Sequence, residues 1–173
     1  MSTLSLVTYP DPFLRRAAQE VSGPDDTLGT LIGDMFAALK ENDGVGLAAP
    51  QVGVSRRIIV ISLGEKEFSR LALVNPTVEY VSPCTEVDEE GCLSIPGVRA
   101  DVPRPVEAVV RGMTKSGRMI EITARDLLAR VLLHEIDHLN GVLFIDRVDK
   151  GERARIASGL SALERRYQAV KTS

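Results

Sequence analysis

The sequence predicts an α+β fold, with mostly antiparallel sheets packed around a central helix and a further helix at the C-terminus. Three observations support this prediction. Helical patterns occur near the start of the chain, around residue 130 and at the end, whereas the middle holds many short β-rich runs punctuated by prolines. The order of these elements is not a repeating βαβ pattern. No repeat or linker divides the chain, so we expect residues 1–173 to form a single domain, with 151–173 as a terminal amphipathic helix.

Two helices are expected in the N-terminal part. Residues 10–21 read as a short helix after a proline-rich turn. A longer helix opens at Pro24, where two aspartates suit the positive end of the helix dipole, and it ends at 42–44. Residues 44–53 are glycine-rich and contain Pro50, so no helix can continue through them.

Short strands are expected in the middle of the chain. The run 57–63 is apolar and rich in β-branched residues, which is typical of a buried strand. Further strand-like segments lie at 70–74, 77–82, 85–90, 105–113 and 118–123, with a hairpin turn at 116–117. Residues 124–140 then form the most regular helical pattern, with a wide apolar face, and a final amphipathic helix is expected at 151–170.

Composition restricts the class of protein. The chain has 173 residues, of which 44% are hydrophobic and 26% are charged, as in a soluble globular protein. No run approaches the ~20 apolar residues of a membrane span, and the first residues show no secretory signal. The net charge of −3 argues against DNA binding. We therefore expect a cytoplasmic protein without membrane association.

The strongest chemical signal is HEIDH at residues 134–138, an H-E-x-x-H pattern on a predicted helix. Side chains four residues apart lie on one helical face, about 5–6 Å apart, so His134 and His138 can bind one metal ion. Glu135 lies between them and can act as a general base. Two core histidines without a metal are the alternative, but these are the only histidines in the chain.

A metal site usually needs a third protein ligand, and the histidines are exhausted. The two cysteines are the next candidates. Cys84 follows a proline in a predicted turn and is more readily interpreted as a small buried hydrophobic residue. Cys92 follows Gly91, which favours a backbone that approaches another group closely.

Three motifs in this order resemble the peptide deformylase family: GVGLAAPQ at 44–51, EGCLS at 90–94 and HEIDH at 134–138. The similarity covers about 150 residues. It implies that Cys92, His134 and His138 bind one divalent metal, with water in the fourth position. The family typically uses Fe(II), and Zn(II), Ni(II) or Co(II) can occupy the site.

The resemblance also implies a reaction: hydrolysis of the N-formyl group from the initiator methionine of a nascent polypeptide, with release of formate. Metal-bound water attacks the formyl carbon, and Glu135 acts as general base and then acid. The side chain of Gln51 and the backbone N–H of Leu93 stabilise the oxyanion. Residues 1–173 are then one catalytic domain, most simply from a bacterial cytoplasm, with an organelle as the less favoured location.

Further residues are expected around this site. The substrate backbone is expected to lie along Gly44, Val45 and Gly46, and the apolar lining to include Leu127 and Val131. Arg99 matches a family position near the substrate channel. The residues expected to support the metal ligands are Glu90, Arg104 and Asp137. Arg130 stands where many bacterial members carry an apolar residue near the pocket for the methionine side chain, although other members carry arginine. A charge there could narrow this pocket or change the preference at the second residue of the substrate.

The C-terminal segment differs in charge from the rest of the chain. Residues 147–173 contain seven basic and three acidic residues, a net charge of +4, which leaves −7 for residues 1–146. In bacterial members a basic terminal helix helps to dock the enzyme on the ribosome near the exit tunnel. A solvated helix face explains the same charges equally well.

Two other classes of function remain open from the residues alone. One is a general H-E-x-x-H metallopeptidase, which would cleave internal peptide bonds. The other is a structural metal domain or interaction module, which would need a closed four-ligand site. Only three good ligands are visible.

Overall fold

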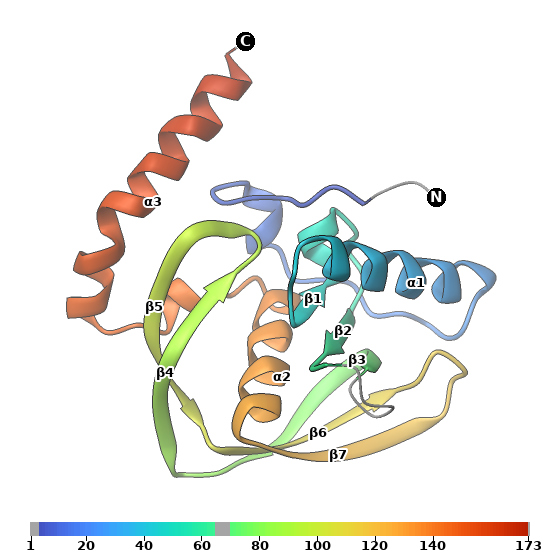
Figure 1. Ribbon diagram of the computed structural model, residues 1–173. Helices are drawn as coiled ribbons and strands as arrows, with labels where there is room; N and C mark the ends of the chain where they lie inside the picture. The colour runs from blue at the N-terminus through green and yellow to red at the C-terminus, as the bar shows by residue number, and fades with distance from the viewer. Residues whose placement is uncertain (1–3, 65–69, 173) are drawn as a thin grey trace.

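The fold is organised around α2 (Asp126–Leu139), which lies between a five-stranded sheet and a long two-stranded hairpin (Figure 1). The computed structural model describes residues 4–64 and 70–172. This arrangement confirms the predicted α+β class with antiparallel sheets, a central helix and a C-terminal helix. Within these residues, no helix combines the length and the apolar composition that a bilayer span requires.

The larger sheet has the strand order β1-β2-β3-β6-β7, and every neighbouring pair is antiparallel. The strands are β1 (Gly46–Ala48), β2 (Ile58–Ser62), β3 (Arg70–Val81), β6 (Glu107–Met113) and β7 (Met119–Arg125). The first four residues of β2 are buried, which explains its uninterrupted apolar run. The two strands predicted at 70–74 and 77–82 are one strand, with an irregularity between Val74 and Thr77.

The smaller sheet is a hairpin of β4 (Thr85–Cys92) and β5 (Ile95–Pro105). Sequence reasoning missed β5, because prolines at 96, 103 and 105 argue against a strand. Each strand of a two-stranded sheet has one edge without a partner strand, and a proline there leaves no ladder hydrogen bond unmade. The register shifts between Gly91 and Cys92, at the turn between the two strands.

The predicted helix at 10–21 is wrong in extent. Only the 3-10 turn η1 (Pro12–Arg15) forms, and the chain then runs extended. The backbone N–H of Ala18 donates to the carbonyl of Leu139 at the end of α2, at 2.8 Å. The N–H of Gln19 donates to the carbonyl of Ser55 at 3.2 Å. The segment satisfies its backbone against its neighbours rather than within a helix.

The remaining helices match their predicted positions. The first, α1 (Asp26–Glu41), is capped by Asp25, whose side chain accepts from the N–H groups of Thr27 and Leu28. The glycine-rich segment after it contains β1 and the 3-10 turn η2 (Ala49–Val52). The last helix, α3 (Lys150–Lys171), follows the turn η3 (Phe144–Asp146), and Ser173, the last residue of the predicted helix, lies outside the described residues. Figure 1 shows α3 beside the hairpin, with its C-terminal end projecting past the rest of the chain.

The two faces of α2 have different neighbours. Its apolar side, which includes Leu132 and Ile136, packs against Ile59, Leu73 and Val110 of the five-stranded sheet. Polar and charged residues on the other side, among them Arg130, His134, Asp137 and His138, are nevertheless buried. The hairpin covers this second side, so polar groups of α2 contact polar groups of β4 and β5 in the buried interior.

Gly141 ends α2 in a conformation that requires glycine. Its φ is +72°, in the left-handed region, and a Cβ would overlap the carbonyl group of Arg15. We predict that Gly141→Ala lowers the free energy of unfolding by about 1–3 kcal/mol, because the backbone must adopt a strained conformation or shift. Thermal or urea unfolding measures the change.

A second glycine provides the control for this prediction. Gly29 lies exposed within α1, with open space around it. Gly29→Ala is expected to stabilise the protein by about 0.5–1 kcal/mol, because alanine restricts the unfolded chain and favours a helix. A Gly141→Ala protein as stable as the parent would contradict the close approach of the two segments.

Candidate metal centre

Three potential metal ligands converge at the end of the hairpin. Cys92 is the last residue of β4, and His134 and His138 lie one turn apart on α2. One ligand atom from each residue lies within 4.8 Å of the other two, and Sγ of Cys92 is 3.2 Å from Nε2 of His138. Among the described residues, this is the one group of three His, Cys, Asp or Glu side chains close enough to hold a metal ion. A thiolate and two imidazoles suit a borderline or soft divalent ion.

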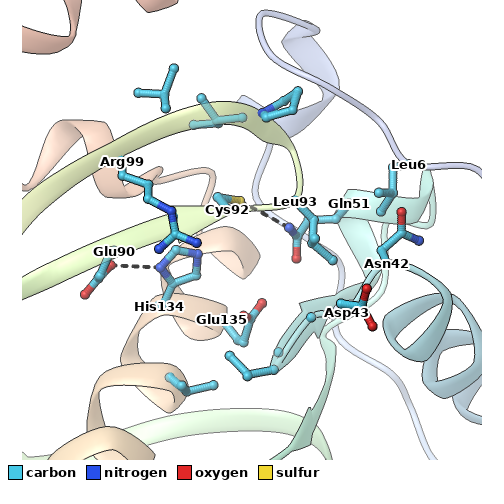
Figure 2. Close-up of a pocket in the computed structure, with 18 of the residues that line it drawn as sticks. Leu6, Asn42, Asp43, Gln51, Glu90, Cys92, Leu93, Arg99, His134 and Glu135 are labelled. Carbon is cyan, nitrogen blue, oxygen red and sulfur yellow. Dashed lines mark hydrogen bonds and ion pairs between the residues drawn. The ribbon is translucent and has the colours of Figure 1, made fainter.

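Glu90 fixes the orientation of His134. Its Oε2 accepts from Nδ1 of His134 at 2.9 Å, which leaves Nε2 to face the cluster (Figure 2). Arg104 donates to both oxygens of Glu90, at 2.9 and 3.0 Å, and to Asp137 at 2.6 Å. Burial alone would raise the pKa of Glu90, but hydrogen bonds from His134 and Arg104 outweigh burial and lower this pKa to about 2. The carboxylate is therefore charged at neutral pH.

Arg130 joins the same buried group. The sequence left open whether its charge would narrow the pocket. Its guanidinium instead donates to Oε1 of Glu90 at 2.9 Å and to the carbonyls of Val102 and Glu86, each at 2.8 Å. The side chain lines the cavity while its charge is directed into the hairpin.

The two imidazoles differ in proton affinity. Burial alone would lower the pKa of His134, but its contacts with Cys92 and Glu90 raise this pKa well above the usual value. Burial and the nearby His134 lower the pKa of His138 well below the usual value. The ligating nitrogen must be unprotonated, so a metal that binds this cluster has to displace any proton on Nε2 of His134, while Nδ1 keeps the proton that it donates to Glu90.

Glu135 projects from α2 into the cavity. Its side chain is buried, and its Oε2 has no hydrogen-bond partner among the described residues. Burial is the largest effect on this carboxyl and raises its pKa to about 7. A Cβ on Gly46 would overlap Oε1 of Glu135 and crowd Val131, so β1 can pass this close to α2 only because residue 46 is glycine. The orphaned oxygen is placed to meet a group that enters the cavity.

Gln51 is held with its amide nitrogen toward Cys92. Its Oε1 accepts from the N–H of Ala48 at 2.8 Å, and this contact identifies the oxygen end of the amide. Its Nε2 donates over longer distances, 3.4 Å to Sγ of Cys92 and 3.3 Å to Oγ of Ser94. The Ser94 contact was missed, because a serine in an extended segment carries no distinguishing sequence signal.

Most of these groups line one cavity of about 780 Å³, whose labelled residues include Gln51, Cys92 and Glu135 (Figure 2). Its walls include every residue that the sequence assigned to substrate binding, namely Gly44, Val45, Gly46, Arg99, Leu127 and Val131, together with Gln51, Glu135 and Leu93. Arg104, Asp137 and His138 do not line the cavity and lie behind its wall. Arg99 is largely exposed and pairs with Glu89 at 3.2 Å.

Some features of the site gave no sequence signal, and one interpretation was wrong. The N-terminal Leu6 and Thr8 also line the cavity, far in sequence from every motif. The ring of Phe144 stacks on that of His134, with centroids 6.2 Å apart. Cys84 is exposed, so its interpretation as a buried hydrophobic residue is wrong. It follows a proline in the turn after β3, where no core is available to cover it.

Comparisons with known proteins agree on one family. The sequence model of the family described as polypeptide deformylase matches residues 3–154. The peptide deformylase of Hydrogenovibrio crunogenus is 46% identical over 156 residues, which cover 90% of this chain and 91% of that protein. The peptide deformylase of Alkaliphilus metalliredigens is 48% identical over 145 residues, 83% of this chain and 95% of that protein.

Solved structures give the same result. A plant peptide deformylase, PDF1B, superposes with a TM-score of 0.95 at 36% identity, covering 100% of this chain and 95% of that one. A peptide deformylase from Synechococcus elongatus in complex with actinonin superposes with a TM-score of 0.88 at 42% identity, covering 93% of this chain and 88% of that one.

We propose that Cys92, His134 and His138 hold the metal, and the two cysteines provide a matched test. Metal-free protein is expected to bind one Co(II) per chain. Cys92→Ala should weaken this binding by more than the ~10–100-fold typical of losing a group that only supports a ligand. Cys84→Ala, at the exposed cysteine, should bind as the parent does. Titration against a competing chelator measures both affinities, and equal affinities in the two variants would rule out Cys92 as a ligand.

Proposed function

Because this chain belongs to the peptide deformylase family, we propose that it removes the N-formyl group from the initiator methionine of nascent polypeptides and releases formate. The observation that carries this proposal is the position of Glu135. Its unpartnered carboxylate oxygen lies buried beside a cluster of three potential metal ligands, at the wall of a cavity large enough for a side chain and a peptide backbone.

One divalent metal is the proposed cofactor, with Fe(II) as the ion in the cell and Zn(II), Ni(II) or Co(II) as substitutes. The three side chains fit this role, because they supply one soft and two borderline donors and leave a position for solvent. When bound, the ion makes water acidic enough to yield hydroxide near neutral pH.

Glu135 is the proposed proton carrier. Its carboxylate takes the proton of the attacking water and later delivers it to the nitrogen that leaves as a free amine. The side chain has little room to move, since it is buried and Gly46 of β1 lies against it. Its orientation is therefore set before the substrate arrives.

Gln51 and Leu93 are the proposed donors to the oxyanion of the tetrahedral intermediate. The amide nitrogen of Gln51 already faces this part of the cavity and makes only long contacts, so it can turn to a substrate oxygen without losing a strong hydrogen bond. The backbone N–H of Leu93 lies next to Cys92, where the hairpin changes register. Such a donor typically contributes ~2.7–4 kcal/mol to the barrier reduction.

The substrate backbone is proposed to extend the larger sheet. Within the described residues β1 pairs with β2 alone, so its other edge is open to a further strand. Gly44 and Val45 lead into β1 at the cavity wall. The methionine side chain would then contact the apolar surface formed by Val45, Leu127 and Val131.

The test of this function uses two peptides, one variant and one matched control. Protein purified without oxygen is expected to release formate from formyl-Met-Ala-Ser, to leave acetyl-Met-Ala-Ser intact and to cleave no internal bond. Glu135→Gln should keep the metal and lose about 10²–10⁴ in turnover, because the amide cannot accept the proton. Metal analysis of the same samples identifies the ion.

Glu121→Gln, at an exposed carboxylate on β7, is the matched control and should turn over as the parent does. Cleavage of an internal peptide bond would favour a metallopeptidase. Unchanged turnover in Glu135→Gln would remove the proposed role of Glu135.

We further propose that the enzyme works in a bacterial cytoplasm and that α3 binds the ribosome near the exit tunnel. Arg165 and Arg166 lie exposed on the projecting part of α3, whereas Ile156, Leu160 and Leu163 pack it against the hairpin. Exchanging surface charges therefore leaves the packed part of the helix in place.

Arg165→Glu combined with Arg166→Glu should weaken cosedimentation with ribosomes and reduce its dependence on salt, because fewer phosphates are contacted. Formate release from the tripeptide should stay unchanged. Ribosome binding equal to that of the parent at every salt concentration would contradict this role of α3.

A further inference from the structure

Arg130 reaches from α2 into the hairpin and contacts both of its strands. One nitrogen donates to the carboxylate of Glu90 and to the carbonyl of Val102 on β5, and the other donates to the carbonyl of Glu86 on β4. Only 8% of the residue is exposed. The planar guanidinium makes these three contacts at once, which the single ammonium of a lysine cannot reproduce.

We propose that Arg130 is a positioning residue for His134, and that it acts through Glu90. This inference rests on the proposed function, in which His134 is a metal ligand. Arg130 holds Oε1 of Glu90, while Oε2 accepts from Nδ1 of His134. The carboxylate therefore cannot turn without breaking one contact or the other.

The side chains that hold Glu90 belong to two different elements, the hairpin and α2. Arg104 contacts both carboxylate oxygens, but Arg104 and Glu90 belong to the same hairpin and move together. Within the part of the chain that the structure describes, the hairpin has no third strand. Arg130 belongs to α2, one turn before His134, so its contact fixes Glu90 relative to the helix that carries the imidazole.

Two hydrogen-bonded ion pairs connect α2 to the hairpin, one on each side of His134. Arg130 joins the hairpin four residues before His134, and Asp137 joins it three residues after, through Arg104. A hydrogen-bonded contact on one side of His134 alone would fix the hairpin relative to α2 at a single point. Contacts on both sides of His134 hold the Glu90–His134 hydrogen bond near its length of 2.9 Å.

Arg130 places a positive charge in the buried wall of the cavity. Burying a guanidinium is unfavourable unless it is paired and hydrogen-bonded. An apolar side chain at this position would pack in the cavity wall without that penalty. The guanidinium donates its hydrogen bonds to Glu90 and to the two carbonyls of the hairpin. These groups position the carboxylate that accepts from His134.

The test compares Arg130→Met with Arg130→Lys and with a surface control. Arg125→Met makes the same substitution at the residue just before α2, where the side chain is 73% exposed and pairs with Glu107. Metal-free proteins are titrated with Co(II) against a chelator, and their thermal unfolding is followed in parallel. Arg130→Met is expected to bind Co(II) about 10–100-fold more weakly, as when a supporting partner of a ligand is lost.

Arg130→Lys keeps the charge but loses the planar guanidinium, so its Co(II) affinity should lie between those of Arg130→Met and the parent. Arg125→Met should bind as the parent does. A residue that only ties the hairpin to the helix would lower the unfolding temperature and leave the Co(II) affinity unchanged, and that result in Arg130→Met overturns the inference. If Arg130→Met does not fold, Arg130→Lys decides, and an affinity equal to that of the parent overturns the inference.

The proposed function is judged separately, since formate release by the parent protein does not enter these titrations. A parent that binds Co(II) but releases no formate would remove the deformylase activity and leave the role of Arg130 intact. If the parent releases formate and Arg130→Met binds Co(II) as tightly as the parent, the deformylase activity stands and the role of Arg130 is overturned.

Discussion

The carboxylate of Glu90 is the point on which the site depends. It is buried, and its four hydrogen bonds come from three side chains on two elements: Arg104 of β5, and Arg130 and His134 of α2. A buried carboxylate with this many charged donors stays ionised, which the lowering of its pKa to about 2 reflects. The hairpin and the helix therefore meet through an ionic contact rather than an apolar one, and this contact orients an imidazole.

This constraint explains why α2 has two unlike faces. One face supplies ordinary apolar packing to the five-stranded sheet, and that packing carries most of the stability expected of such a core. The other face is polar and buried against the two-stranded hairpin of β4 and β5. Stability and chemistry are thus divided between opposite sides of one helix, so a change on the Glu90 side can alter the site while the apolar core is kept.

Sequence reasoning found what local spacing determines. The i, i+4 histidines and the helix that bears them follow from short-range geometry, whereas Cys92 was assigned as a ligand through the family resemblance. The structure brings Cys92, His134 and His138 together. Sequence reasoning missed β5, because three prolines are tolerated in a strand that has one open edge. It extended the helix at 10–21, although the backbone of Ala18 bonds to the end of α2 instead. The contacts of Arg130 and Ser94 depend on segments that are distant in sequence, so no local pattern could reveal them.

The exposure of Cys84 affects how the sulfur chemistry of this chain can be followed. The two thiols differ in accessibility, since Cys84 lies in an open turn and Cys92 is partly buried at the cavity. An alkylating or disulfide-forming reagent added to the whole protein reaches the outer thiol first, so the earliest labelling reports a group outside the cavity. A chain with alanine at position 84 gives a clean background, in which any added oxygen or label detected by mass spectrometry on cysteine belongs to the cavity sulfur.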